Sequence, residues 1–111
     1  MSTKIKFTYK EKDYVLEYDR YSIKVMEKQG FNAEKFTEQP MTMVELAFEG
    51  AFLKNHAKIT KAEVEEIYNL FANKKDLVNQ LIVMIQQTYS TLFENDENEG
   101  DASKNIEWKV D

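Results

Sequence analysis

The first eighteen residues contain two runs in which apolar and polar residues alternate. The apolar members are Ile5, Phe7 and Tyr9 in the first run and Tyr14, Leu16 and Tyr18 in the second. A period of two is typical of strands with one buried face, and the polar stretch 10–13 between the runs predicts a β-hairpin. Because an isolated hairpin is only marginally stable in water, its aromatic face must pack against the rest of the chain.

The residues after this hairpin, up to about residue 93, are predicted to form helices. Asp19 and Gly30 suit the two ends of a helix over about 19–29, with its apolar face inward, and a shorter helix is expected over 31–38. Pro40 then breaks the chain. Thr42 and Thr60 each precede a glutamate by three residues, the capping-box spacing, which predicts helices near 43–54 and 61–72. A last helix is expected over about 75–93. The inward residues expected on the first helix are Tyr21, Val25 and Met26, and both Met41 and Met43 are expected to pack under the 43–54 helix.

These elements predict an α+β fold in which an N-terminal β-hairpin packs on a bundle of four to five helices. A chain of 111 residues with 42% hydrophobic residues forms one domain with a core of its own. The absence of cysteine rules out disulfides and fits a reducing compartment such as the cytoplasm. The longest unbroken apolar run, 81–85, is too short to span a bilayer, so no membrane partner is expected.

The last predicted helix has more apolar width than one core requires. At 100° per residue its apolar side chains cover an arc of about 180°, whereas packing on a single core needs an arc of about 100°. Val83 falls outside even the wider arc. The extra width requires a second neighbour, which is the protein's own hairpin, another copy of the chain, or a different protein.

An acidic stretch separates this body from a short apolar tail. The domain organisation predicted is a single domain over 1–93, a flexible acidic linker over 94–104, and a strand-like tail over 105–111. Five acids and no base lie between Glu94 and Asp101, and the net charge of the chain is also −5, so the rest of the chain is electrically balanced. The tail alternates Ile106, Trp108 and Val110. Three interpretations of this tail stay open. It can add a third strand to the hairpin, it can bind a partner by strand addition or by insertion of Trp108 into a pocket, or its strand can be exchanged between two copies of the chain.

No constellation of residues predicts catalysis, a metal site or a cofactor. His56 is the only histidine and there is no cysteine, so a zinc or catalytic role lacks partners at ligand spacing, and a local hydrogen-bonding role is expected. The acidic stretch does not fit a calcium loop, because Ile106 stands where the twelfth-position glutamate belongs. Net acidity argues against nucleic acid, and the tyrosines of the hairpin are in phase with Phe7 or Leu16, as core residues would be.

Three segments carry a resemblance to a known family. They are Lys4-Ile5-Lys6-Phe7-Thr8-Tyr9-Lys10-Glu11-Lys12-Asp13-Tyr14, then 22–31 with Met26-Glu27-Lys28-Gln29-Gly30-Phe31, and Pro40-Met41-Thr42-Met43 running into Gly50-Ala51-Phe52-Leu53-Lys54-Asn55-His56. With these segments, residues 4–93 resemble tail assembly chaperones, which are small proteins encoded in the tail module of phages and prophages of Gram-positive bacteria. The acidic end that contains tryptophan is similar as well.

The resemblance implies a non-enzymatic role in virion morphogenesis. The expected partners are the phage tail tube and tape-measure proteins, with a second copy of the chain as another candidate, and the expected location is the host cytoplasm rather than the mature virion. The partner-binding residues predicted are Leu81, Ile82, Val83, Tyr89 and Trp108. The competing hypothesis is a phage-encoded inhibitor or adaptor that binds a host protein, for instance by acidic mimicry of DNA.

Overall fold

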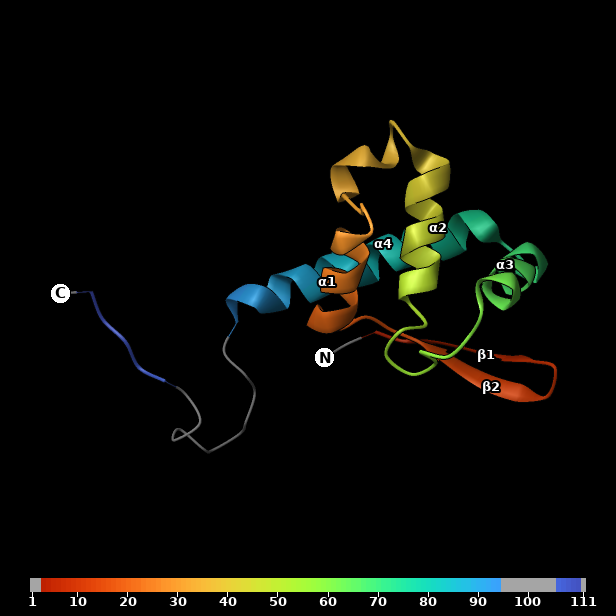
Figure 1. Ribbon diagram of the computed structural model, residues 1–111, viewed down its shortest axis with the longest axis horizontal. Helices are drawn as coiled ribbons and strands as arrows, with labels where there is room; N and C mark the ends of the chain where they lie inside the picture. Colours follow the sequence, from red (N-terminus) through yellow and green to blue (C-terminus); the bar gives the residue numbers. More distant parts are fainter. Residues whose placement is uncertain (1–2, 95–105, 111) are drawn as a thin grey trace.

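The computed structural model describes residues 3–94 and 106–110, and it has the α+β architecture expected (Figure 1). An antiparallel two-stranded hairpin comes first and four α-helices follow, with a 3-10 turn after the first and the last helix. The elements are β1 Ile5–Tyr9, β2 Lys12–Leu16, α1 Arg20–Lys28, η1 Ala33–Phe36, α2 Pro40–Gly50, α3 Lys61–Leu70, α4 Lys74–Ser90 and η2 Thr91–Phe93. Within the described ranges, no helix has both the length and the apolar character needed to cross a membrane.

The hairpin turns over only two residues. Ile5 pairs with Leu16 and Tyr9 with Lys12, so Lys10 and Glu11 form the turn with φ of 50° and 63°. Left-handed backbone at both positions matches the right-handed twist of the strands, which explains why the turn is so tight despite the absence of glycine. Among the described residues the sheet contains β1 and β2, and residues 106–110 form no strand on it. The predicted linker falls almost wholly on 95–105, outside the described residues.

Aromatic rings join the hairpin to the helices. Phe7 stacks on Tyr14 with ring centroids 5.1 Å apart, and it meets Phe71 edge-on at 4.9 Å. From the other side, Phe52 approaches both hairpin rings and Phe48 of α2. Tyr14 and Leu16 are buried. The hairpin face is therefore covered by the turns that follow α2 and by the segment that joins α3 to α4.

Local capping signals identified two helix starts correctly and one incorrectly. The side chains of Asp19 and Thr60 each accept a hydrogen bond from the backbone N–H at N3, and the side chains of Ser22 and Glu63 each accept one from the backbone N–H of the cap residue, so both boxes form. By contrast, α2 begins at Pro40, three residues before the expected start, and Thr42 caps nothing. A proline at the first helical position loses no intrahelical hydrogen bond, so Pro40 starts this helix and does not merely end the preceding segment.

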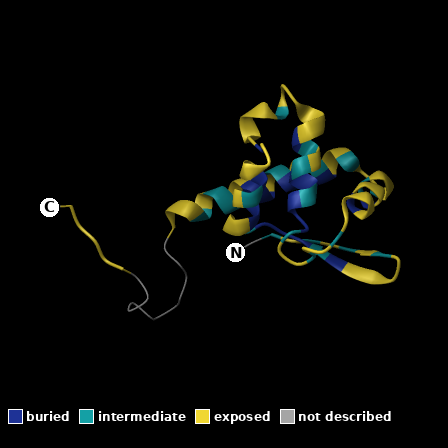
Figure 2. Cartoon of the chain, viewed as in Figure 1, coloured by how far each residue is buried: buried dark blue, intermediate teal, exposed yellow. Residues whose placement is uncertain are grey.

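The inward faces of α1 and α2 differ from the predicted ones at one position each. Ser22, Ile23 and Met26 are buried on α1, whereas Tyr21 is 69% exposed. The capping box turns Ser22 toward the interior, and Tyr21, one residue earlier, therefore points outward. On α2, Met43 is buried as expected, but Met41 is 87% exposed. Buried residues gather where α1, α2 and α4 meet the end of β2, and the hairpin tip and the outer face of α3 are exposed (Figure 2).

A glycine permits the close approach of α1 and α2. A Cβ added to Gly50 would lie 2.5 Å from Cγ of Met26 and closer still to its Sδ. Met26 is fully buried and has little room to move. Packing between these helices therefore depends on the missing side chain at Gly50.

We expect Gly50→Ala to lower the free energy of unfolding by about 1–3 kcal/mol, because the added methyl group overpacks the interface with Met26. Helix propensity alone would give the opposite sign, since alanine is favoured over glycine in helices by about 0.5–1 kcal/mol. Urea denaturation of the wild type and the variant measures the difference. In a Met26→Ala background the clash partner is gone, so the same change should become neutral or stabilising; equal destabilisation in both backgrounds would contradict the packing argument.

Candidate protein-binding surface

The inner face of α4 is part of the core. Its buried residues are Leu77, Leu81, Met84 and Ile85, spaced as one helical stripe. Most of the wide apolar arc predicted for this helix is therefore covered by the protein's own body. Leu81, one of the predicted partner-binding residues, is 1% exposed. Its side chain is not accessible to a partner in this structure. It can contribute to a binding surface only by packing in the core and holding α4 in place.

Two further predicted residues lie outside this stripe, Ile82 beside it and Val83 on the opposite face of the helix. Ile82 is half-buried, and Val83 is 43% exposed. Their positions follow from the helical period, since one step of 100° beyond Leu81 places Ile82 beside the buried face and a second places Val83 nearly opposite to it. Val83 thus presents an aliphatic side chain to solvent.

Tyr89 connects α4 to α1. Its hydroxyl donates a hydrogen bond to Oε2 of Glu27 over 2.7 Å, and its half-buried ring packs against the core. Burial, followed by the hydrogen bond to Glu27 and the charge of that carboxylate, raises the pKa of Tyr89 to about 12. The tyrosine therefore stays protonated and keeps the two helices in register near the carboxyl end of α4.

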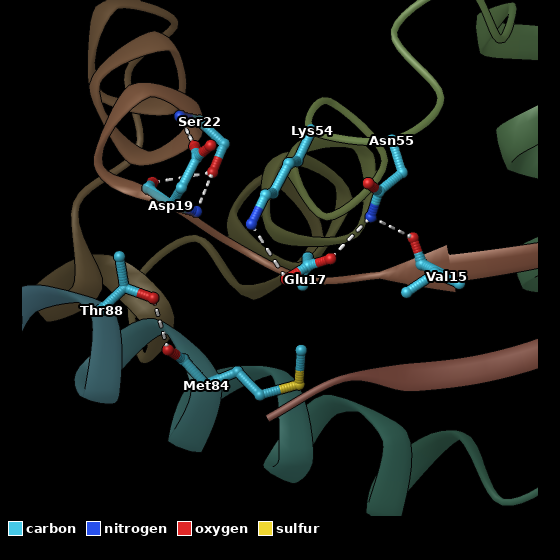
Figure 3. Close-up of polar contacts among 8 residues, drawn as sticks. All are labelled: Val15, Glu17, Asp19, Ser22, Lys54, Asn55, Met84 and Thr88. Atoms are coloured by element: carbon cyan, nitrogen blue, oxygen red, sulfur yellow. Dashed lines mark hydrogen bonds and ion pairs between the residues drawn. The ribbon is translucent and has the colours of Figure 1, made fainter. Parts of the chain in front are cut away.

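Polar contacts fix this end of α4. The Nε of Arg20 donates to Oγ1 of Thr91 over 3.3 Å, and its Nη2 donates to the Thr91 carbonyl. A cation at a helix carboxyl terminus also stabilises the unpaired carbonyl groups there. The hydroxyl of Thr88 donates to the Met84 carbonyl over 3.0 Å, as Figure 3 shows. The helix end is therefore held against α1 by named hydrogen bonds.

Two large apolar side chains project just beyond this fixed end. Leu92 is exposed, and Phe93 is 88% exposed, in the 3-10 turn η2. The sequence placed Phe93 within the packed arc of the last helix and gave no reason to single out Leu92. The missing signal is the change from α-helix to 3-10 turn at Thr91, which moves the following side chains off the helical stripe.

The tail adds three more exposed apolar side chains. Trp108 is 80% exposed, and Ile106 and Val110 are exposed to a similar degree. We refer to Leu92, Phe93, Ile106, Trp108 and Val110 together as the C-terminal apolar set. Exposed large apolar side chains commonly mark a site of protein contact where they form a continuous patch.

A buried carboxylate, which the sequence did not reveal, has a structural role. Glu17 follows β2 and is buried, with Lys54 Nζ 3.2 Å from its Oε1 and Asn55 Nδ2 2.8 Å from its Oε2 (Figure 3). Burial by itself would raise the pKa of Glu17, but the hydrogen bonds from Asn55 and Lys54 and the charge of Lys54 outweigh it and hold the pKa below its ordinary value. All partners of Glu17 come from the segment after α2, so the group joins the hairpin to that segment.

The single histidine makes local contacts. Nε2 of His56 accepts a hydrogen bond from the Val15 backbone N–H over 3.0 Å, and its ring centroid lies 4.8 Å from that of Tyr14. Burial, and then the nearby charge of Lys12, lowers the pKa of His56 below 6.5. Across residues 3–94 and 106–110, no three His, Cys, Asp or Glu side chains lie together in a way that could hold a metal ion.

We expect the stability of the wild type to fall as the pH is lowered from about 7 to about 5. The pKa of His56 is lower in the folded state than in the unfolded state, so the unfolded chain binds the proton first and folding is opposed below the unfolded value of about 6.5. One such proton contributes a slope of at most about 1.4 kcal/mol per pH unit. In His56→Gln, whose Oε1 can accept the Val15 N–H, this part of the slope should vanish. Chemical denaturation at several pH values measures it, and parallel pH profiles for the two proteins would contradict the assignment.

Comparison with known families places the whole chain in one of them. The family described as a domain of unknown function, DUF5055, matches residues 1–111, so the chain belongs to the DUF5055 family. No curated protein and no solved structure matches the chain.

Proposed function

We propose that this member of the DUF5055 family is a non-enzymatic phage tail assembly chaperone. In this role it binds the tail tube protein, the tape-measure protein or both during virion morphogenesis, acts in the cytoplasm of the host cell, and is absent from the mature virion. The resemblance of residues 4–93 to such chaperones supplies the class of client. The observation that carries a holding role is the C-terminal apolar set, in which Phe93 is 88% and Trp108 is 80% exposed.

The client expected by this proposal has complementary surfaces. A tube subunit before assembly exposes strand edges and apolar loops, which otherwise pair with the next subunit. An extended tail that alternates Ile106, Trp108 and Val110 can add a strand to such an edge and place one face of side chains into its pockets. Phe93, fixed at the end of α4, and Val83 on the same helix offer apolar contacts on the rigid body.

The magnitudes favour reversible binding. Burying a large apolar side chain contributes about 1.5–3 kcal/mol, so the five members of the set contribute roughly 8–15 kcal/mol in total. Association and the ordering of the tail cost about 4–15 kcal/mol. This cost offsets a large part of the gain, which suits a protein that must release its client to the growing tail. Leu81 and Tyr89 contribute by keeping α4 in place, and Ile82 by its exposed edge.

We expect Phe93→Lys and Trp108→Lys each to weaken co-purification with the tail tube protein about tenfold or more, because each removes an apolar contact worth at least about 1.4 kcal/mol. Both side chains are exposed, so the fold should be unchanged. Leu70→Lys is the matched control, since Leu70 is 68% exposed but lies on α3. Quantitative pull-down with a purified tube subunit measures the effect. Binding that is unchanged in both variants would overturn the chaperone assignment.

A second set of substitutions separates this function from the inhibitor or adaptor alternative, against which the concentration of the acids in one stretch, instead of over a face, already argues. Replacing Glu94, Asp96, Glu97, Glu99 and Asp101 by their amides removes five negative charges and leaves the apolar set intact. A chaperone should keep its client, whereas an acidic mimic should lose its target. Loss of a host-protein complex in the amide variant, with no effect of Trp108→Lys on it, would favour the alternative.

A further inference from the structure

A second apolar feature lies between α2 and α3, away from the C-terminal apolar set (Figure 1). These helices enclose a groove of about 460 Å³, within the range of volumes typical of binding sites. Its apolar lining consists of Pro40, Met41, Val44 and Phe48 of α2 and Val64 and Tyr68 of α3. Residues four apart in a helix lie on one face of it, so each helix contributes one face to the groove.

The floor of the groove is fixed and its edge is adaptable. Phe48 is buried, and its ring meets that of Tyr68 edge-on with centroids 5.2 Å apart, so the core holds the floor in place. Met41, at one edge, is 87% exposed and has no core role to explain its apolar side chain. Methionine is flexible and polarisable, and it is common on surfaces that accept apolar groups of varied shape. The groove is therefore suited to apolar side chains from another molecule.

Unpaired carboxylates surround the apolar lining. Glu45 and Glu49 of α2 and Glu65 of α3 belong to the groove, against a single base, Lys61. In the part of the chain that the structure describes, none of these three carboxylates has a cation within ion-pair distance. Burial raises the pKa of Glu49 above its ordinary value, and the charge of Glu45 adds to this shift while that of Lys61 opposes it. The rim therefore has an excess of negative charge that a cation from outside would offset.

We infer that the α2–α3 groove binds a cationic amphipathic helix of a partner protein. Its apolar side chains would pack against Phe48 and Tyr68, and its Lys or Arg side chains would face Glu45 and Glu65. The groove is lined by two helices and offers no strand edge, so a helix laid in the groove fits better than an added strand. Lys and Arg suit this arrangement, because their aliphatic stems can lie on apolar surface while the charged ends reach the rim.

The chain's own tail does not have this chemistry. Lys109 is flanked by Glu107 and Asp111, and five acids lie in the stretch before the tail, so the tail would bring negative charge to an acidic rim. The inference therefore concerns a different protein. It goes beyond the proposed function, since this surface lies apart from the C-terminal apolar set and is tested without the tail tube protein.

A synthetic peptide tests the groove on the purified full-length protein. The probe is a fluorescein-labelled amphipathic helix of about 14 leucine and lysine residues, and its counterpart has glutamate in place of each lysine. We expect fluorescence anisotropy to show binding of the lysine peptide that weakens as salt is added, and binding of the glutamate peptide that is weaker by about tenfold or more. Absence of binding by the lysine peptide, or equal binding of the two peptides, would overturn the inference.

Substitutions in the protein locate the site. Glu45→Lys and Glu65→Lys should each weaken binding of the lysine peptide by about three- to tenfold. Glu34→Lys makes the same change of charge at an exposed position on η1 and should bind this peptide like the wild type. Met41→Ser should weaken binding severalfold, because it removes an exposed apolar contact. The double variant Glu45→Lys/Glu65→Lys should prefer the glutamate peptide, a gain that loss of folding cannot produce.

The acidic stretch 94–101 is the other place at which a cationic peptide could bind. The variant with five amides in this stretch separates the two sites, because it leaves the groove unchanged. Binding that persists in the amide variant and falls in Glu45→Lys and Glu65→Lys supports the inference. Binding that is lost in the amide variant and unchanged in the groove variants would overturn it. Either result leaves the pull-down with the tail tube protein unaffected, since that experiment depends on Phe93 and Trp108.

Discussion

Cover for the hairpin is the requirement on which the rest of this structure depends. Two five-residue strands cannot hold together alone in water, and their inner face is made of large rings. Phe7 and Tyr14 both meet Phe52 from the turns after α2, and Phe7 also meets Phe71 from the α3–α4 connection, so a single aromatic cluster helps to set the positions of three helices. The buried Glu17 and its partners Lys54 and Asn55 then fix the same junction by hydrogen bonds.

The sequence predicted the parts of the fold that local chemistry determines. Alternation located both strands, and the reciprocal capping of Asp19 and Thr60 located two helix starts, because these signals act within a few residues. The prediction was less accurate where contacts between residues distant in the sequence determine the structure. Thr42 had the same spacing as Thr60, yet α2 starts at Pro40, and Met41 is exposed while Met43 is buried. Which side of α2 faces inward is set by its neighbours and not by its own caps.

The candidate site shows the same limit more sharply. The width of the apolar arc on α4 could be predicted, but the part of it that remains exposed could not, since α1 and α2 cover Leu81 and leave Val83 in solvent. Leu92 and Phe93 project because α4 changes to a 3-10 turn at Thr91, where Arg20, 71 residues earlier in the chain, donates a hydrogen bond. A contact between residues so far apart in the chain leaves no signal in the apolar periodicity of the helix. The tail was evident from the sequence because its alternation and its tryptophan are local features.

The excess charge of this chain lies beside the apolar side chains of its C-terminal part. The body carries no net charge, and the whole excess of five acids lies in the stretch that precedes the tail. Net charge opposes indiscriminate association, and placing it beside the apolar side chains opposes it where it is most needed. Like-charged stretches on two copies repel, so a partner can be retained only where several apolar contacts form together. Such a requirement favours a partner whose surface is shaped to fit these side chains over one that offers only an irregular apolar patch.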